Sequence, residues 1–298
     1  MWQLLIDGGA RAIRVGLVVT LSLGWSAVSN AQQPAAPQCQ PSGSLVRIPE
    51  LPEGSGVAIS GRTPGRLWAH NDSGDAVLVA LDTRGAVTGR VRVAGVKVDD
   101  WEAVAVGPCP GGSCIYIADI GDNEAERKRI TIYRVSEPST GDSVALKDTF
   151  HATYPDGAHD AEAFLVAPDG SLFIVTKGET DPVGLYRFPR ELRPGATHQL
   201  ERVGKPRTVS EGERITDGSV SPDGTWVVLR TKQGLVFHRA ADLFGGNWTG
   251  AGRVDLKAVG EPQGEGVAIA ADGAVYLTGE GGGKSQPGTF AKLSCSVK

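Results

Sequence analysis

Residues 265–280, EGVAIAADGAVYLTGE, contain the pattern that decides the fold. An acidic residue and a glycine precede alternating apolar residues, a turn follows at Ala271-Asp272-Gly273, and a second alternating run ends at Glu280. Alternation with a period of two is typical of β-strands, and a short Asp-Gly turn between two such runs is typical of an antiparallel hairpin. The stretch therefore predicts two neighbouring strands of one sheet.

The same pattern occurs five times along the chain. Its copies begin 47 to 60 residues apart, at Ser55, Glu102, Glu162, Asp217 and Glu265. Further alternating runs follow each copy, so each repeat has the length and content of a four-stranded propeller blade. The sequence predicts an all-β fold, a five-bladed β-propeller. The alternative is a β-sandwich in which the repeats are coincidental.

The fifth repeat ends after its third strand, and residues 44–48 (SLVRI) can supply the missing outer strand. This closure brings Cys39 close to Cys295, and Cys109 and Cys114 flank a tight turn between two strands. We expect a disulfide in each pair, because an even number of cysteines in an exported chain indicates disulfides. Free thiols or a metal site are the alternatives, although no two cysteines have the two-residue spacing of a zinc site.

The N-terminus indicates export. Arg11 and Arg14 precede an apolar run over residues 15–25, and small residues precede a cleavage site after Ala31. This run is too short to span a bilayer, which takes roughly 20 residues. We expect a signal peptide at 1–31, a linker at 32–43 and a single propeller domain at 44–298, soluble and monomeric, secreted or periplasmic. The formal net charge of −4 argues against nucleic acid and anionic membranes as partners.

Polar residues recur where first strands begin and second strands end. In a propeller the first strands line the central channel, so these residues should meet at one mouth of the channel. The predicted ring consists of the five repeat-start residues: Ser55, Glu102, Glu162, Asp217 and Glu265. The second strands add Asp72, Asp119, Lys177 and Arg230 around it, and Asp160 precedes a first strand at the same mouth.

Four carboxylates in a narrow channel repel one another, by about 4 kcal/mol for a pair 4 Å apart at an effective dielectric near 20. A cation, protonation, or Lys177 and Arg230 can offset this repulsion. Oxygen ligands in a flexible ring suit Ca²⁺, and the alternative is a structural network of hydrogen bonds between blades. Asp169, Asp223 and Asp272 stand in Asp-Gly turns and are expected to form turns rather than to act in catalysis.

The order Ser-Glu-Glu-Asp-Glu, one residue per repeat, resembles the axial calcium site of calcium-activated nucleotidases (apyrases), which are five-bladed propellers. The acids together with Lys177 and Arg230 also resemble the six-bladed β-propeller phytases. The resemblance covers the repeat pattern over residues 53–295. It implies that the five ring residues are calcium ligands, and Asp217 departs from it by standing where a hydroxyl would also fit.

These features favour an exported calcium-binding propeller that hydrolyses a phosphate ester or a similar anion bound at the channel mouth. Glu162, Asp72 or Asp119 would act as the base, and Lys177 and Arg230 would neutralise developing charge. A glycosidase with paired carboxylates is a second enzymatic alternative. A non-catalytic propeller that binds a ligand or a protein is the competing class, because no catalytic motif is present. The sequence leaves open whether the protein is an enzyme.

Overall fold

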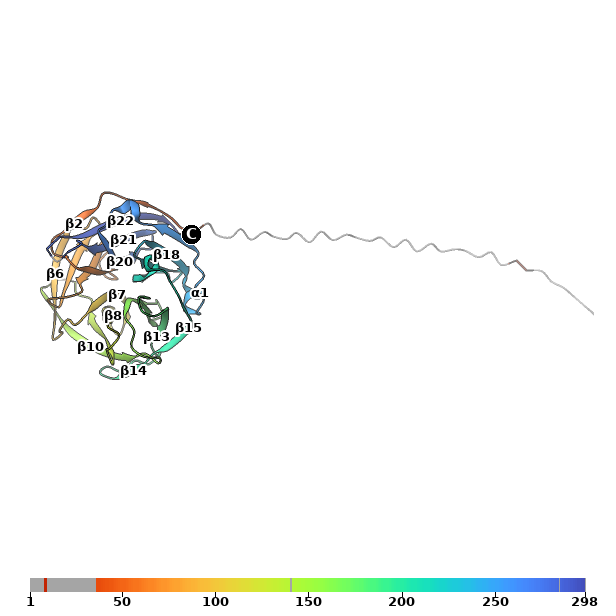
Figure 1. Ribbon diagram of the computed structural model, residues 1–298, viewed down its shortest axis with the longest axis horizontal. Helices are drawn as coiled ribbons and strands as arrows, with labels where there is room; N and C mark the ends of the chain where they lie inside the picture. The colour runs from red at the N-terminus through yellow and green to blue at the C-terminus, as the bar shows by residue number, and fades with distance from the viewer. Residues whose placement is uncertain (1–7, 10–35, 140, 284, 298) are drawn as a thin grey trace, which may run out of the picture. The chain divides into compact units, whose positions relative to one another are not determined.

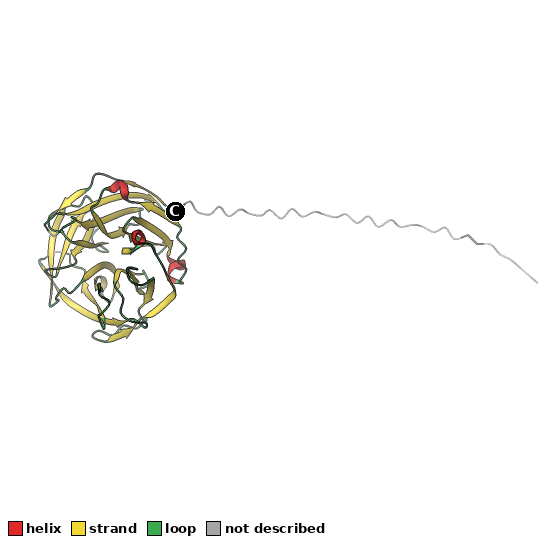
Figure 2. Cartoon of the chain, in the orientation of Figure 1, coloured by secondary structure: helices red, strands yellow, loops and turns green. Residues whose placement is uncertain are grey.

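The computed structural model describes residues 8–9, 36–139, 141–283 and 285–297. The expected apolar run at 15–25 and the cleavage site after Ala31 lie outside the described residues. Residues from Ala35 onward belong to one unit, in which strands predominate and the helical segments are short (Figure 2). These segments are Glu211–Glu213, α1 (Ala240–Phe244) and Lys257–Val259. No helix among the described residues has the length and apolarity needed to cross a membrane.

The strands form four sheets arranged around a common centre (Figure 1). The largest has nine strands: β3 (Gly54–Ile59), β4 (Arg66–Asn71), β5 (Val77–Asp82), β6 (Val87–Ala94), β7 (Trp101–Cys109), β8 (Gly112–Asp119), β9 (Ile130–Ser136), β10 (Ser143–Thr153) and β14 (Thr197–Gln199). Two sheets have four strands each. The first contains β11 (Ala161–Val166), β12 (Leu172–Thr176), β13 (Val183–Arg187) and β15 (Glu201–Arg207). The second contains β16 (Ile215–Val220), β17 (Trp226–Thr231), β18 (Gly234–Arg239) and β19 (Gly252–Asp255). The last contains β1 (Gln38–Pro41), β2 (Val46–Ile48), β20 (Gln263–Ile269), β21 (Ala274–Glu280) and β22 (Gly288–Ser296).

The predicted Asp-Gly turns form as expected. Asp169 Oδ1 accepts a hydrogen bond from the backbone N–H two residues later, at 2.9 Å, and Asp223 and Asp272 do the same at 3.0 Å. The glycine after each aspartate has a φ of 70° to 83°, where a side chain would be strained. These aspartates therefore shape hairpins, as predicted.

The first strands of the repeats pack side by side in a closed cycle, in the order β3, β7, β11, β16, β20 and back to β3. Hydrophobic clusters fill the spaces between successive sheets. Between the β7–β10 ladder and the β11–β15 sheet, for example, Tyr116, Phe150 and Phe164 are buried together. This packing holds the ends of the first strands at fixed positions around the centre.

The nine-stranded sheet consists of two antiparallel ladders, β3–β6 and β7–β10, that the sequence predicts as separate units. They join where residues 143–145 of β10 pair in parallel with residues 92–94 of β6. β10 is 11 residues long and extends beyond its partner β9. Its free end therefore reaches the edge of the preceding ladder and covers it, which removes an exposed sheet edge.

Both ends of the described unit meet in the last sheet. β2 pairs antiparallel with β22, as predicted for residues 44–48, and β1 also pairs with β22 although it lies in the expected linker. Disulfides join Cys39 to Cys295 and Cys109 to Cys114, so both predicted pairings are confirmed. Two disulfides indicate that the chain matures in an oxidising compartment, extracellular or periplasmic.

Candidate functional site

A β-bulge interrupts every pairing between a first strand and its second strand, close to the start of the first strand. Each bulge contains one polar residue that has lost its regular place in the ladder. These residues are Ser55, Glu102, Glu162, Thr216 and Glu265. Bulges re-aim side chains and often lie beside active sites, so they explain how five polar groups can occupy equivalent places on neighbouring inner strands.

The fourth bulge contains Thr216 and not the predicted Asp217. Thr216 Oγ1 donates a hydrogen bond to the carbonyl oxygen of Glu265 on the next first strand, at 3.0 Å. Ser55 Oγ does the same to the carbonyl oxygen of Glu102, at 2.9 Å. Asp217 lies one residue later and has a regular place in the ladder, opposite Arg230. Its Oδ2 accepts a hydrogen bond from the backbone N–H of Val267, at 2.7 Å, and its side chain is 1% exposed.

Three carboxylates come together next to these bulges. One oxygen from each of Glu102, Asp160 and Glu162 lies within 4.8 Å of the other two, and all three residues are buried. Asp160 immediately precedes β11, and Glu162 stands in the bulge at the start of that strand. Asp160 was predicted at the channel mouth but not among the metal ligands.

Lys177 provides the positive charge in this cluster. Its Nζ lies 2.6 Å from Glu162 Oε1, 3.1 Å from Asp160 Oδ2 and 3.6 Å from Glu179 Oε2. It also donates to Asn123 Oδ1 at 3.2 Å. One ammonium therefore contacts two buried carboxylates and a third at the exposed rim.

Burial and mutual repulsion favour the protonated forms of Glu102 and Glu162. Burial raises the pKa of Glu162 to about 8, with a further contribution from the charge of Glu265. Burial also raises the pKa of Glu102 well above its ordinary value, and Glu162 adds to the effect. Lys177 opposes the shift at Glu162 but does not cancel it. Without a further cation, Glu162 therefore keeps its proton near neutral pH.

The donor set fits a hard divalent cation. All the groups are oxygen donors, namely three carboxylates, with the hydroxyl of Ser55 at 3.2 Å from Glu102 Oε2. Asp160 Oδ1 accepts a hydrogen bond from the N–H of Asp122 at 2.8 Å. Asp160 Oδ2 is buried and accepts no hydrogen bond within the part of the chain that the structure describes, although Lys177 Nζ lies 3.1 Å away. That oxygen has the electron pairs and the position to bind a cation.

The other predicted site residues lie outside this cluster. Arg230 is buried, forms an ion pair with Glu261, and donates from Nη1 to the carbonyl oxygens of Gly266 and Thr278, both at 2.7 Å. Asp119 is buried and forms an ion pair with Arg127 at 2.7 Å. These partners neutralise both charges, so Arg230 and Asp119 have a structural role in place of the predicted catalytic one.

Asp72 and Glu265 are less completely satisfied. Burial, followed by the charge of Glu53, raises the pKa of Asp72 to about 6. Burial raises the pKa of Glu265, whose Oε1 accepts a hydrogen bond from Gln263 Nε2 at 2.9 Å. Both residues are partly exposed, so they remain accessible to a molecule at the mouth.

Comparison with solved structures shows a propeller-type fold. An aldose sugar dehydrogenase from Streptomyces coelicolor, solved in its PQQ-bound form, matches 89% of this chain and 100% of its own with 12% identity and a TM-score of 0.53. A glucose dehydrogenase (12% identity, 84% and 99% covered, TM-score 0.47) and a gluconolactonase from Xanthomonas campestris (14%, 80% and 72%, 0.43) are also similar. At these identities the likeness concerns the fold alone. The sequence matches no protein-family model and no curated protein.

Proposed function

We propose that the protein is an exported five-bladed β-propeller that binds Ca²⁺ at the cluster of Glu102, Asp160 and Glu162. The blade count follows if the nine-stranded sheet is divided at the short β6–β10 pairing, which gives five antiparallel ladders. Five hydrophobic clusters, each between two successive ladders, support this division.

The excess of negative charge in the cluster carries the calcium proposal. The cluster holds three buried carboxylates, of which Lys177 contacts two, and burying unpaired carboxylates is costly. Ca²⁺ accepts roughly six to eight oxygen ligands at variable angles, so carboxylates, the Ser55 hydroxyl and water can complete its shell. Asp217 and Glu265, the other two acids predicted as ligands, would not bind the ion directly. Their charges would instead influence the electrostatic potential around the site.

The proposed activity is hydrolysis of a phosphate ester or a similar anion. A bound Ca²⁺ would polarise the anion and lower the pKa of a bound water. Lys177 would hold the anion by charge, because its Nζ lies at the edge of the cluster. Asp72 is the preferred base, since a pKa of about 6 leaves it mostly ionised at neutral pH and still able to take a proton.

The carboxyl separation raises a glycosidase as the second candidate. The oxygens of Glu102 and Glu162 lie within 4.8 Å of each other, close to the roughly 5 Å that separates the two carboxyl groups of retaining glycosidases. Both residues are buried, however, and Lys177 contacts Glu162 directly. A sugar ring would have to displace that contact, so we favour the cation.

Titration calorimetry with Ca²⁺ on the metal-free protein tests the metal site. We expect saturable binding that Glu162→Gln weakens and that Glu191→Gln, at an exposed position, leaves unchanged. Turnover of a panel of phosphoesters and glycosides, with and without Ca²⁺, tests the activity. Absence of binding heat would overturn the calcium site, and inactivity of the calcium-loaded protein on the whole panel would leave the non-catalytic binding propeller.

A further inference from the structure

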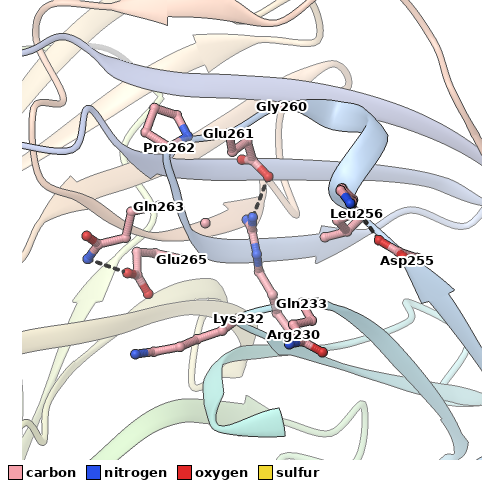
Figure 3. Close-up of a pocket in the computed structure, with 12 residues that line it drawn as sticks. Arg230, Lys232, Gln233, Asp255, Leu256, Gly260, Glu261, Pro262, Gln263 and Glu265 are labelled. Atoms are coloured by element: carbon pink, nitrogen blue, oxygen red, sulfur yellow. Dashed lines mark hydrogen bonds and ion pairs between the residues drawn. The ribbon is translucent and has the colours of Figure 1, made fainter. Parts of the chain in front are cut away.

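A polar cavity outside the acidic cluster is lined in part by Glu265. Its volume is about 750 Å³, within the roughly 300–1,000 Å³ of small-molecule sites. One wall is the C-terminal end of β17 and the residues after it, which provide Arg230 and Lys232 (Figure 3). The other wall is the segment 255–265, which provides Gln263 and Glu265. Glu265 also lies close enough to the cluster for its charge to raise the pKa of Glu162.

Two buried polar atoms of residues that line the cavity have no hydrogen-bond partner among the described residues. The side chain of Arg230 is 1% exposed, and its Nε donates no hydrogen bond. The side chain of Glu261 is 5% exposed, and its Oε1 accepts none, because only Oε2 contacts Arg230. The Arg230–Glu261 ion pair therefore has one hydrogen-bond donor, Arg230 Nε, and one acceptor, Glu261 Oε1, that remain available. A hydroxyl group complements such a pair, since it can accept one hydrogen bond and donate another.

The charges around the cavity balance. Arg230, Lys232 and Lys257 face it together with three acids: Asp255, Glu261 and Glu265. A polyanion would meet as much repulsion as attraction there. The amides of Gln233 and Gln263 add further donors and acceptors at the rim. This wall is suited to a neutral ligand that has many hydrogen-bonding groups.

We propose that this cavity binds a neutral polyhydroxylated molecule, either a sugar or a linear polyol. The proposal rests on the proposed function in one respect: the cavity would hold the sugar-like part of a substrate whose anionic group lies at the calcium cluster. Glu265 would contact both parts, because it stands between the cavity and the cluster. The substrate class is then a phosphorylated or otherwise anionic sugar derivative.

Ligand-observed NMR and calorimetry on the full chain in EDTA test the cavity independently of the metal. The probes are D-glucose, D-galactose, D-mannose, D-xylose, maltose and D-glucitol, with inorganic phosphate as the competitor. We expect at least one neutral probe to bind saturably without displacement by phosphate. Glu261→Gln should weaken that binding about tenfold, since it changes the free acceptor. Gln233→Ala should also weaken it, whereas Gln199→Ala, an exposed position on β14, should not.

Three results would overturn the proposal: no neutral probe binds, phosphate displaces the probe, or Gln233→Ala and Glu261→Gln bind as well as the wild type. If Glu261→Gln melts at a lower temperature because Arg230 loses its partner, Gln233→Ala alone decides, since it leaves the ion pair intact. Loss of Ca²⁺ binding with retained sugar binding would remove the proposed function and keep the cavity. Retained Ca²⁺ binding with loss of sugar binding would keep the proposed function and remove the cavity proposal.

Discussion

The Nζ of Lys177 lies 2.6 Å from Glu162 Oε1 and contacts Asp160 from the same position. Lys177 follows β12, the second strand, while Glu162 stands in the bulge of β11, the first strand. A single hairpin therefore carries two acids and the cation that partly neutralises them. The third acid, Glu102, comes from the neighbouring first strand, so the charge balance of the cluster depends on how two adjacent ladders pack.

Replacement of Lys177 by methionine should destabilise the metal-free protein by about 3 kcal/mol, because it leaves buried carboxylates without their cation. Urea unfolding at neutral pH measures the change. Saturating Ca²⁺ should recover more stability in Lys177→Met than in the wild type. The control is Lys97→Met, at an exposed position. Equal stability of Lys177→Met and the wild type would show that Lys177 contributes nothing to the cluster.

The metal-free protein should lose stability as the pH rises from about 4.5 to about 8. Glu162 has a folded-state pKa of about 8 against an ordinary value of 4.5, so the folded state binds more protons than the unfolded state in this window. The slope for this group is at most about 1.4 kcal/mol per pH unit. Unfolding curves at several pH values measure it, and Glu162→Gln should flatten them.

Calcium binding should release protons near neutral pH, because the cation requires ionised carboxylates. Calorimetry in buffers with different ionisation enthalpies counts the protons. Binding should become tighter as the pH rises towards 8. Binding that is independent of buffer and pH would mean that Glu162 is already ionised in the metal-free protein.

The two hydroxyl bridges between first strands should contribute similarly to stability but differently to metal binding. Ser55→Ala and Thr216→Val each remove a hydrogen bond to a carbonyl oxygen of the next strand, at a cost of about 1 kcal/mol. Only Ser55→Ala should weaken Ca²⁺ binding, since Ser55 also contacts Glu102 Oε2. Thr180→Val, at an exposed position, serves as the control. Equal loss of Ca²⁺ affinity in both variants would contradict this separation.

The two disulfides should contribute unequally to stability. Cys39 and Cys295 are 256 residues apart, and Cys109 and Cys114 are 5 apart. By chain entropy the long loop is worth roughly 5 kcal/mol and the short one roughly 2 kcal/mol. Denaturant unfolding of the double serine variants measures both. A larger loss from the short loop would show that local strand pairing, not chain closure, depends on the bond.

The sequence was sufficient for the strand repeats, because alternation and Asp-Gly turns such as Pro168-Asp169-Gly170 are local signals. It was also sufficient to place Glu102 and Glu162 at equivalent positions. It could not distinguish Thr216 from Asp217, because a bulge shifts the alternation by one residue and leaves no local mark. Nor could it foresee that Glu261 neutralises Arg230, since Glu261 lies in a segment without periodicity.

Because β1 and β2 pair with β22, their sheet cannot form until β22 has been synthesised. Residues 38–48 precede the other strands of the propeller, yet both of their strands pair with β22, the last strand among the described residues. The sheet that contains Glu265 is therefore the last that can form. A product truncated before Gly288 lacks the strand that pairs with β1 and β2 and one of the two partners of β21, and it also lacks Cys295, the disulfide partner of Cys39. Such a product would expose unpaired sheet edges, which are the surfaces through which incomplete chains aggregate.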